Sequence, residues 1–319
     1  MLGGIFPTVL TPWTDDDRLD EAALEAQVDD LIGNGVNGLV ILGSIGESPL
    51  VSEGERDAII ARTLAAVHGR VPVIAGVTAL GTKNAVEQVA RGRALGLTAS
   101  LVALPTYYDS SFDRVKQHYL AAAAAGPIFY YNYPAATRLR LSHDQVGEII
   151  SLPGVVGIKE SVFDLEQIAA HIARSAGNRY FSVLSGSELD YLDVMRLGAH
   201  GAISAGAVVM PRTAVALHRA WLTNDMERAK KLQNQLFEAL PCMVELGSSV
   251  AAARLGLQTA LKNGKVPEGS VDTTIARLKH ALALRGMPIK PHVRAPLAPL
   301  TERDRQAVSQ AMLKISEIL

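Results

Sequence analysis

One lysine of the chain stands where a buried strand is expected to end. Lys159 closes the short apolar run in "GVVGIKES", residues 154–161, and it is the only lysine placed directly on the end of a predicted strand. An amine held in an apolar pocket loses hydration, which favours its neutral, nucleophilic form. Such an amine attacks a carbonyl carbon to form a Schiff base. The position therefore indicates imine chemistry, with a solvated strand end as the alternative.

Hydroxyl side chains end or follow other apolar runs of the same kind. Tyr131 ends the run before that of Lys159, and Ser44 and either Tyr107 or Tyr108 follow two earlier runs. Carbinolamine dehydration and C–C cleavage both move protons, which a tyrosine can relay when a second hydroxyl lies within hydrogen-bonding distance. A single tyrosine of this kind is as often a packing residue. As a set beside a lysine, these hydroxyls indicate a proton relay.

A glycine-flanked turn could hold an anionic group. The stretch "GSIGES", residues 43–48, follows an apolar run and supplies backbone N–H groups that suit a carboxylate. The eight histidines include no pair at metal-ligand spacing, and no Walker A, H-E-x-x-H or G-x-S-x-G pattern occurs. We therefore expect no metal and no cofactor other than the covalent imine itself.

The elements that must position these residues follow an alternating pattern. Short, unalternated apolar runs indicate strands that are covered on both faces. These runs span residues 5–10, 38–42, 71–77, 99–103, 128–131, 155–159, 180–184 and 201–204. Amphipathic segments lie between them, two of which begin with capping-box patterns, Ser52 with Glu55 and Ser142 with Gln145. Eight such units predict a (β/α)8 TIM barrel, whose active site gathers at the C-terminal strand ends.

A doubly wound sheet uses the same units and is the main competitor. No strand is followed by G-x-G-x-x-G with an acidic residue about 20 residues later, so the barrel is favoured. From residue 224 onward the pattern is purely helical, apart from the Pro-rich stretch "MPIKPHVRAPLAPL". We therefore predict a barrel over residues 1–224 and a C-terminal helical region over residues 225–319.

The composition limits the class of protein. Hydrophobic residues make up 48% of the 319 residues, enough for a large core, and the net charge of -1 gives no general attraction to nucleic acid or anionic membranes. The single cysteine, Cys242, excludes an intrachain disulfide. No apolar run approaches the roughly 18 residues of a membrane span, and the N-terminus lacks a signal-peptide pattern. We expect a soluble, cytoplasmic protein without membrane or nucleic-acid partners.

The ordered set of strand-end motifs resembles a known enzyme family. "GSIGE", a proline with paired tyrosines in "LPTYY", "YNYP" and "GIKES" together resemble the dihydrodipicolinate synthase/N-acetylneuraminate lyase family of class I, pyruvate-dependent aldolases. The resemblance extends from "GIFPTVLTPW" to "VRAPLAPLTERDR" and so covers nearly the whole chain. It implies a (β/α)8 barrel with C-terminal helices, a small 2-oxo acid as substrate, and a homotetramer.

The resemblance assigns roles to individual positions. Lys159 matches the Schiff-base lysine, and Tyr131 matches the tyrosine that relays protons to the bound pyruvyl group. Ser44 matches the first hydroxyl residue of the family's G-[TS]-T-G-E turn, and the amides of Ser44 and Ile45 match those that hold the pyruvate carboxylate. Tyr107 matches a relay tyrosine that some members contribute to a neighbouring subunit. These matches make Lys159, Tyr131, Ser44 and Tyr107 the expected catalytic residues.

Further positions are expected to contact the substrate. Gly186 and Ile203 match pocket-lining positions near the keto acid, and Ser161, two residues after the lysine, is a candidate polar contact. The sialic acid lyases carry a Gly-Tyr-Asp-Glu run that binds the sugar chain, whereas this chain reads "GSEL" at residues 186–189. The lost polarity favours a shorter or less polar 2-oxo acid.

Two departures from the family pattern concern substrate choice. Ile45 replaces the usual second threonine of the turn, which removes a hydroxyl but keeps the backbone N–H. Ala136 stands where the dihydrodipicolinate synthase branch has an arginine that binds the aldehyde's carboxylate. Arg138 and Arg140 stand two and four residues after this position, and two residues of extended chain span about 6–7 Å. Arg138 is the nearer candidate to take over this contact.

We therefore expect a class I aldolase or lyase that acts on pyruvate or a short 2-oxo acid. Dehydration of the 2-oxo acid is a related possibility, because the same enamine can expel a β-substituent. The first alternative is 4-hydroxy-tetrahydrodipicolinate synthase, which condenses pyruvate with aspartate semialdehyde. An alternative of another class is a keto-acid-binding barrel that has lost turnover, motivated by Ile45.

Overall fold

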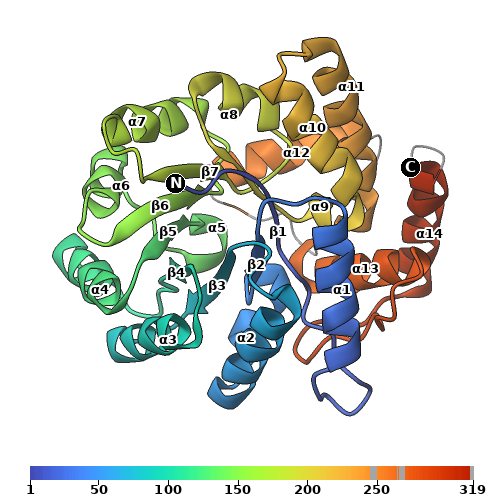
Figure 1. Ribbon diagram of the computed structural model, residues 1–319, viewed down its shortest axis with the longest axis horizontal. Helices are drawn as coiled ribbons and strands as arrows, with labels where there is room; N and C mark the ends of the chain where they lie inside the picture. The colour runs from blue at the N-terminus through green and yellow to red at the C-terminus, as the bar shows by residue number, and fades with distance from the viewer. Residues whose placement is uncertain (245–249, 264, 266–269, 317–319) are drawn as a thin grey trace.

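Eight parallel strands form a closed barrel. The computed structural model describes residues 1–244, 250–263, 265 and 270–316. Its strands form one sheet in the order β1-β8-β7-β6-β5-β4-β3-β2, and a parallel bridge between Thr8 and Val40 joins the two ends of this order. Helices surround the strands (Figure 1). The predicted (β/α)8 barrel is confirmed.

Each predicted apolar run coincides with one strand. The strands are β1 (Gly4–Pro7), β2 (Leu39–Ile41), β3 (Val73–Thr78), β4 (Ala99–Ala103), β5 (Ile128–Asn132), β6 (Val155–Glu160), β7 (Ser182–Ser185) and β8 (Gly201–Ser204). The predicted and the observed ends of these strands differ by a few residues. Tyr180, predicted within a strand, lies before β7 and is exposed.

Alternate residues of the strands fill the barrel interior. Phe6, Leu101 and Phe129 belong to an inner buried cluster, whereas their neighbours Val102 and Tyr130 belong to the larger cluster beneath the helices. Successive side chains of a strand point to opposite faces, so strands buried on both faces carry continuous apolar sequence. The same alternation decides which polar residues enter the barrel.

The helices of the barrel follow the predicted amphipathic segments. They are α1 (Glu21–Gly33), α2 (Glu53–Val67), α3 (Thr82–Leu95), α4 (Phe112–Ala125), α6 (His143–Ile150), α7 (Leu165–Ser175), α8 (Tyr191–Leu197) and α10 (Pro211–Leu222). Both predicted capping boxes are present, at the starts of α2 and α6. The single-turn helices α5 (Pro134–Thr137) and α9 (Gly206–Val209) were not predicted, because four residues are too few to show helical periodicity.

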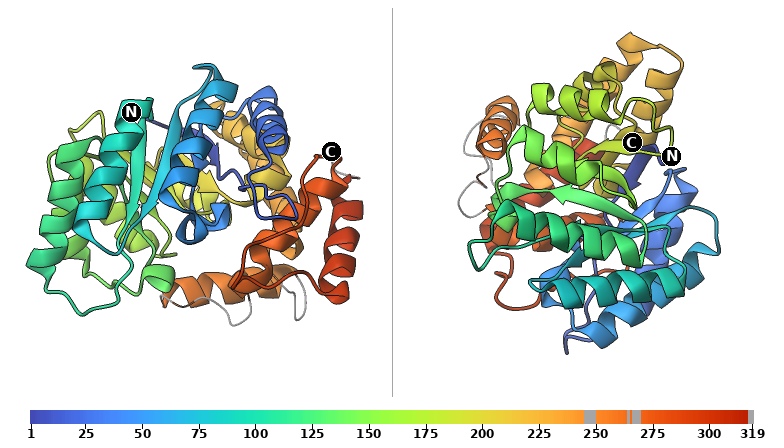
Figure 2. Two further views of the ribbon diagram at one scale, coloured as in Figure 1. Left: turned by 90° about the horizontal axis from the view of Figure 1, so that it is seen from below. Right: turned by 90° about the vertical axis from the view of Figure 1, so that its left-hand side faces the viewer.

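Further helices follow the barrel. They are α11 (Met226–Leu236), the 3-10 segment η3 (Phe237–Cys242), α12 (Val250–Lys262), α13 (Ser270–Leu284) and α14 (Glu302–Ser316). The Pro-rich stretch 287–300 forms no helix. The left view of Figure 2 shows α12, α13 and α14, in orange and red, along the lower and right-hand edge of the molecule. Parts of the predicted helical stretches, residues 245–249, 264, 266–269 and 317–319, lie outside the described residues.

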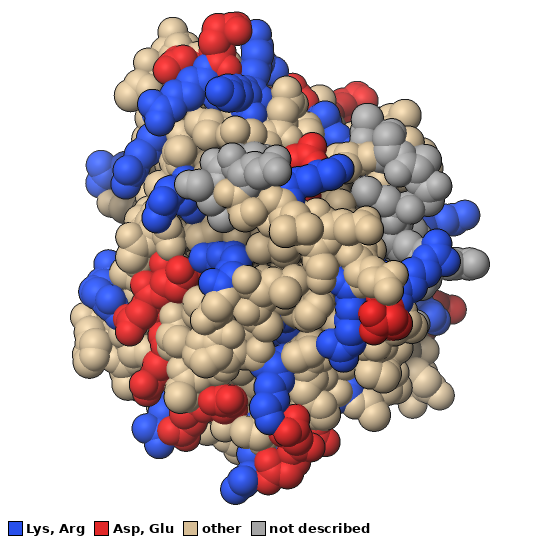
Figure 3. Space-filling view, turned by 90° about the vertical axis from the view of Figure 1, so that its right-hand side faces the viewer, with Lys and Arg blue, Asp and Glu red and all other residues tan. Residues whose placement is uncertain are grey.

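The surface charge agrees with the net charge of -1. Figure 3 shows one face of the molecule, on which basic and acidic side chains are intermixed. Within the described ranges, no helix has the length and apolar character to cross a membrane.

Candidate active site

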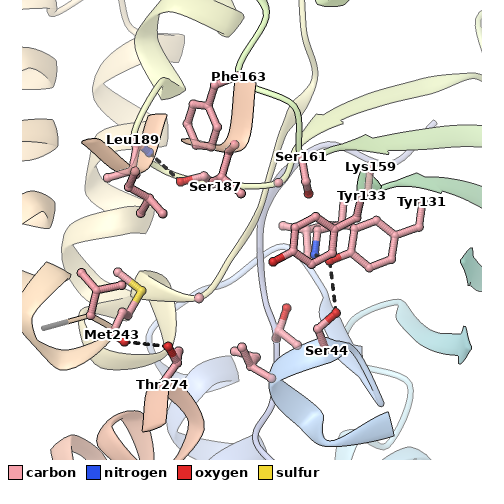
Figure 4. A pocket seen from close by; sticks show the side chains of 18 of the residues that line it. Ser44, Tyr131, Tyr133, Lys159, Ser161, Phe163, Ser187, Leu189, Met243 and Thr274 are labelled. Atoms are coloured by element: carbon pink, nitrogen blue, oxygen red, sulfur yellow. Dashed lines mark hydrogen bonds between the residues drawn. The ribbon is translucent and has the colours of Figure 1, made fainter. Parts of the chain in front are cut away.

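Strands β5 and β6 place the lysine beside a tyrosine. Tyr131 and Lys159 are register partners in this parallel pair. Tyr131 lies two residues after Phe129 and belongs with it to the inner cluster, so its ring faces the barrel interior. Lys159 Nζ lies 3.1 Å from Tyr131 Oη and donates a hydrogen bond to it. Figure 4 shows the two side chains next to each other in the cavity.

Burial sets the protonation of Lys159. Only 6% of the residue is exposed, and the loss of hydration lowers the pKa of its amine to about 7. None of the described residues that line the cavity carries a carboxylate that would stabilise the ammonium form. A large fraction of the amine is therefore neutral at pH 7, as nucleophilic attack on a carbonyl requires.

The neighbouring carboxylate is held on the other side of the strand. Glu160 accepts hydrogen bonds from Asn132 Nδ2 at 2.8 Å and from the backbone N–H of Val162 at 2.7 Å. Its Oε2 atom also lies 3.0 Å from Nε2 of His171, in α7. Because Glu160 and Lys159 are consecutive in a strand, they face opposite sides of the sheet. Glu160 therefore fixes the end of β6 without pairing with the amine.

A hydroxyl pair completes the polar part of the cavity. Ser44 Oγ and Tyr131 Oη share a hydrogen bond of 3.4 Å (Figure 4). Burial raises the pKa of Tyr131 to about 12, and its hydrogen bonds with Ser44 and Ser161 oppose this increase. The ring of Tyr133 stacks on that of Tyr131, with centroids 5.5 Å apart. The phenol therefore keeps its proton at neutral pH and can donate it to a substrate oxygen.

The loop after β2 supplies backbone donors. It begins with the 3-10 turn η1 (Ser44–Gly46), and N–H groups at the start of a helical turn have no partner within it. Those of Ser44 and Ile45 are thus suited to bind an anion.

The next residue, Glu47, links this turn to the C-terminal helices. It lies in the left-handed region, with a φ angle of 57°, and its buried carboxylate accepts a 2.6 Å hydrogen bond from Lys279 Nζ of α13. This ion pair ties the turn to the C-terminal helices.

The ends of β6, β7 and β8 form the opposite part of the cavity. Gly186 donates from its backbone N–H to the carbonyl oxygen of Glu160 at 2.6 Å. A Cβ atom at Gly186 would lie only 2.1 Å from Ser161 Oγ, so the absent side chain leaves room for this serine. The cavity has a volume of about 190 Å³. It is lined by five of the predicted substrate positions, Ser44, Ile45, Ser161, Gly186 and Ile203.

Two predicted site residues lie away from the cavity of their own chain. Tyr107 is 80% exposed, and its ring meets that of Tyr108 edge-on, with centroids 4.9 Å apart. Arg138 caps the C-terminus of α5 in the left-handed conformation and is exposed. Arg140, also exposed, donates a hydrogen bond to the carbonyl oxygen of Asn263 at 2.8 Å. None of these side chains is part of the cavity wall.

Several lining residues were not predicted from the sequence. Tyr133 belongs to "YNYP" and follows the end of β5, so its position in that motif could have indicated it. The apolar side chains from beyond the barrel could not have been found in this way, because no strand end leads to them. They are Met243, Val244, Leu257, Leu261 and Ile275.

Among the described residues, neither the thiol nor the His and acidic side chains form a reactive-thiol or metal site. Cys242 is buried in η3, and burial raises the pKa of its thiol to about 12, so it remains protonated. In the part of the chain that the structure describes, no group of His, Cys, Asp or Glu side chains is arranged to hold a metal ion.

Known proteins resemble this chain over its whole length. A family model described as the Dihydrodipicolinate synthetase family matches residues 1–270. A protein of Sorangium cellulosum, named 4-hydroxy-tetrahydrodipicolinate synthase, is 34% identical over 98% of this chain and 96% of its own length.

Solved structures extend this likeness to the fold. YagE of E. coli K12, a prophage protein of the dihydrodipicolinic acid synthase family solved in complex with pyruvate, has a TM-score of 0.85 and 27% identity, covering 99% of each chain. A protein described as the first monomeric dihydrodipicolinate synthase variant has a TM-score of 0.82 and 28% identity, covering 100% of this chain and 98% of its own. With its barrel, its buried lysine and tyrosine, and these relatives, the chain belongs to the dihydrodipicolinate synthetase family.

Proposed function

We propose that this chain is a class I aldolase that binds pyruvate, or a short 2-oxo acid, as an imine on Lys159. Its family membership makes it a lyase. The observation that carries the imine proposal is the buried amine, which lies 3.1 Å from a phenol and has a pKa lowered to about 7. That arrangement supplies a neutral nucleophile and a proton donor at the same carbonyl group.

The proposed reaction begins with attack of Lys159 Nζ on the C2 carbonyl carbon of the keto acid. The Tyr131 hydroxyl group protonates the oxygen of the resulting carbinolamine, which leaves as water and gives the protonated imine. Loss of a proton from C3 then forms an enamine, with the imine nitrogen as electron sink. Ser44, which shares a hydrogen bond with Tyr131, provides the next step of the proton relay. The covalent imine thus takes the place of a separate cofactor.

The carboxylate of the keto acid is assigned to the turn after β2. The backbone N–H groups of Ser44 and Ile45 lie at the start of η1, on the same side of the cavity as the Tyr131 hydroxyl. A carboxylate held there would place C2 toward Lys159. Ile45 provides only its amide for this role, so loss of the threonine hydroxyl at this position leaves the keto-acid site intact.

A second candidate is 4-hydroxy-tetrahydrodipicolinate synthase activity, because the curated relatives at 29–34% identity carry that name. Against it, Ala136 is exposed and replaces the arginine of that branch, and neither Arg138 nor Arg140 lines the cavity. These positions leave the carboxylate of aspartate semialdehyde without a partner from this loop. A keto-acid-binding barrel without turnover is the third candidate, and it requires the imine to form but to react no further.

The working form of the protein is proposed to be a cytoplasmic homotetramer. The exposed pair Tyr107 and Tyr108 supports assembly, because two large aromatic side chains, 80% and 77% exposed, would be covered by a neighbouring subunit. The similar structure described as a monomeric variant makes the single chain the competing state.

Trapping the imine tests the proposal directly. The protein is incubated with pyruvate, reduced with borohydride and digested, and mass spectrometry locates the pyruvyl adduct. We expect one adduct, on Lys159, that is absent from the Lys159→Arg variant and retained in the Lys83→Arg variant, which changes an exposed lysine. No adduct with pyruvate or with other 2-oxo acids would overturn the imine mechanism.

A further inference from the structure

The wall of the cavity beyond the reactive amine is mostly apolar, and its two hydroxyl side chains, Ser187 and Thr274, share hydrogen bonds with the backbone of Leu189 and Met243. Phe163 and Leu189 come from the loops after β6 and β7, Met243 directly follows η3, and Leu257 and Ile275 come from α12 and α13. Phe163, Met243 and Leu257 also pack against the buried cluster that contains Leu189 and Leu240. The wall is thus the surface of a packed apolar layer, and it faces Lys159 across the cavity.

The cations near this wall do not serve the cavity. Arg254, in α12, lies with its guanidinium 4.0 Å from the ring centroid of Phe237 and donates a hydrogen bond to the carbonyl oxygen of Leu189 at 3.1 Å. Arg138 is exposed outside the cavity, and Arg140 donates to Asn263. Among the described residues of the lining, Lys159 is the only one with a basic side chain. A second carboxylate on the substrate would therefore meet no cation among the described residues of this wall.

The free energy of moving a substituent from water to this wall differs between substrate classes. A carboxylate moved from water to an apolar wall without a partner loses much of its hydration energy, whereas an apolar group gains free energy at the same place. Most hydroxyl groups of a sugar chain would likewise lose their hydrogen bonds to water, because Ser187 and Thr274 on this wall already bond to the backbone. The wall thus selects an apolar substituent over an anionic or polyhydroxylated one.

From this we propose that the second substrate is an aldehyde with a short apolar substituent, branched aliphatic or with a single aromatic ring. The inference rests on the proposed imine chemistry at Lys159 and adds the class of aldehyde that reacts with the enamine. An apolar protein cavity of about 150 Å³ holds benzene. The cavity here, of about 190 Å³, must also hold the keto acid, so the space that remains limits the substituent to one ring at most.

The step balances without an external oxidant or reductant. C3 of the Lys159-bound enamine forms a bond to the aldehyde carbon, and the aldehyde oxygen takes one proton to become a hydroxyl group. Water then attacks the imine carbon, which restores the C2 carbonyl and frees the amine. The product is a 4-hydroxy-2-oxo acid with the apolar group on C4, and the reverse sequence cleaves the same C3–C4 bond.

An aldehyde panel tests the inference separately from the imine. After the borohydride test, the full-length protein is given pyruvate with isobutyraldehyde or benzaldehyde, and in parallel with aspartate semialdehyde, glyoxylate or glyceraldehyde. We expect kcat/KM for the apolar aldehydes to exceed the other values by about ten-fold or more. An adduct without this preference, or without turnover of any aldehyde, overturns the inference alone, and absence of the adduct overturns the proposed function and the inference together.

Variants of α12 connect the preference to the wall. Leu257→Ala removes apolar surface from the wall, and we expect it to lower kcat/KM for benzaldehyde by about ten-fold while the pyruvate adduct on Lys159 still forms. Leu255→Ala, in the same helix but 66% exposed, is the matched control and should change neither value. If Leu257→Ala does not fold, the milder Leu261→Val variant replaces it. Unchanged kinetics in a folded wall variant that still forms the adduct would contradict the assignment of this wall to the aldehyde.

Discussion

Adjacent residues of β6 have opposite chemical roles because a strand alternates its faces. Lys159 enters an apolar cavity with no carboxylate in its described lining, and burial lowers its pKa. Glu160 faces outward and is held by Asn132 and the backbone of Val162. Had the two side chains shared a face, an ion pair would have kept the amine protonated. The single-residue alternation thus makes the lysine a nucleophile.

The lowered pKa predicts how imine formation depends on pH. Only neutral Lys159 attacks the carbonyl, so the rate of pyruvate trapping should increase as the pH rises through about 7 and level off above it. The measurement is the initial rate of borohydride-trapped adduct between pH 5.5 and 9. A rate that is still rising at pH 9, as for an unperturbed lysine, would contradict the assignment.

Removal of the Tyr131 hydroxyl group should slow the proton transfers while leaving the fold intact. We expect Tyr131→Phe to lower kcat for the aldol reaction by about 10²–10⁴-fold, the usual contribution of general acid–base catalysis. The Ser44→Ala change should have a smaller effect, because Ser44 acts through Tyr131. Tyr180→Phe, at an exposed tyrosine before β7, is the control. Equal kcat values for Tyr131→Phe and the unmodified protein would exclude the relay.

At the scale of the elements, the strands were predictable because their sequence is locally informative. Runs buried on both faces are apolar throughout, and a polar residue at the end of such a run, such as Lys159 or Tyr131, stands out. The apolar wall carries no such local signal. Met243 and Leu257 look like ordinary core residues, and only the packing of the C-terminal helices over the barrel brings them to the cavity. The exposed position of Arg138 also depends on α5, which is one turn long.

The loop after β7 depends on a glycine for close packing against the loop after β6. A methyl group at Gly186 would lie 2.1 Å from Ser161 Oγ and 2.9 Å from the carbonyl oxygen of Glu160, so Gly186→Ala must displace one of the two loops. We expect this variant to lose at least about ten-fold in kcat/KM, because small misplacements of reacting groups have effects of that order. Gly54→Ala, in α2 with open space around it, should retain activity and stability. Full activity of Gly186→Ala would show that the loops can separate freely.

The contact between η1 and α13 is a buried ion pair. Lys279 and Glu47 have fully buried side chains 2.6 Å apart, and Lys279 also donates to the carbonyl oxygen of His292. Lys279→Met leaves the carboxylate of Glu47 buried without its cation, and loss of one partner of such a pair costs about 3–5 kcal/mol. We expect the free energy of unfolding in urea to fall by that amount. The double variant with Glu47→Gln should regain part of the loss, and Lys230→Met, at an exposed lysine, should cost little.

At the scale of the whole molecule, one cavity is built from two parts of the chain far apart in sequence. The barrel supplies the amine, the phenol and the backbone donors, and the segment after η3 with helices α12 and α13 supplies most of the apolar wall. Arg285, directly after α13, pairs with Asp30 of α1 at 2.9 Å, which is a second charged link besides that of Lys279 with Glu47. The reaction type therefore depends on the barrel, and the choice of partner aldehyde depends on the C-terminal helices.

The exposed tyrosines predict the assembly of the molecule. Tyr107 and Tyr108 follow β4, and water around two large exposed rings favours an interface that covers them. For the proposed homotetramer, sedimentation velocity should give a mass about four times that of the 34.0 kDa chain. The double change Tyr107→Ser/Tyr108→Ser should shift the protein toward smaller species, whereas Tyr180→Ser, at a tyrosine that is 61% exposed, should not. If the unmodified protein sediments as a fully active single chain, Tyr107 serves no neighbouring site, and the proton relay is confined to Tyr131 and Ser44.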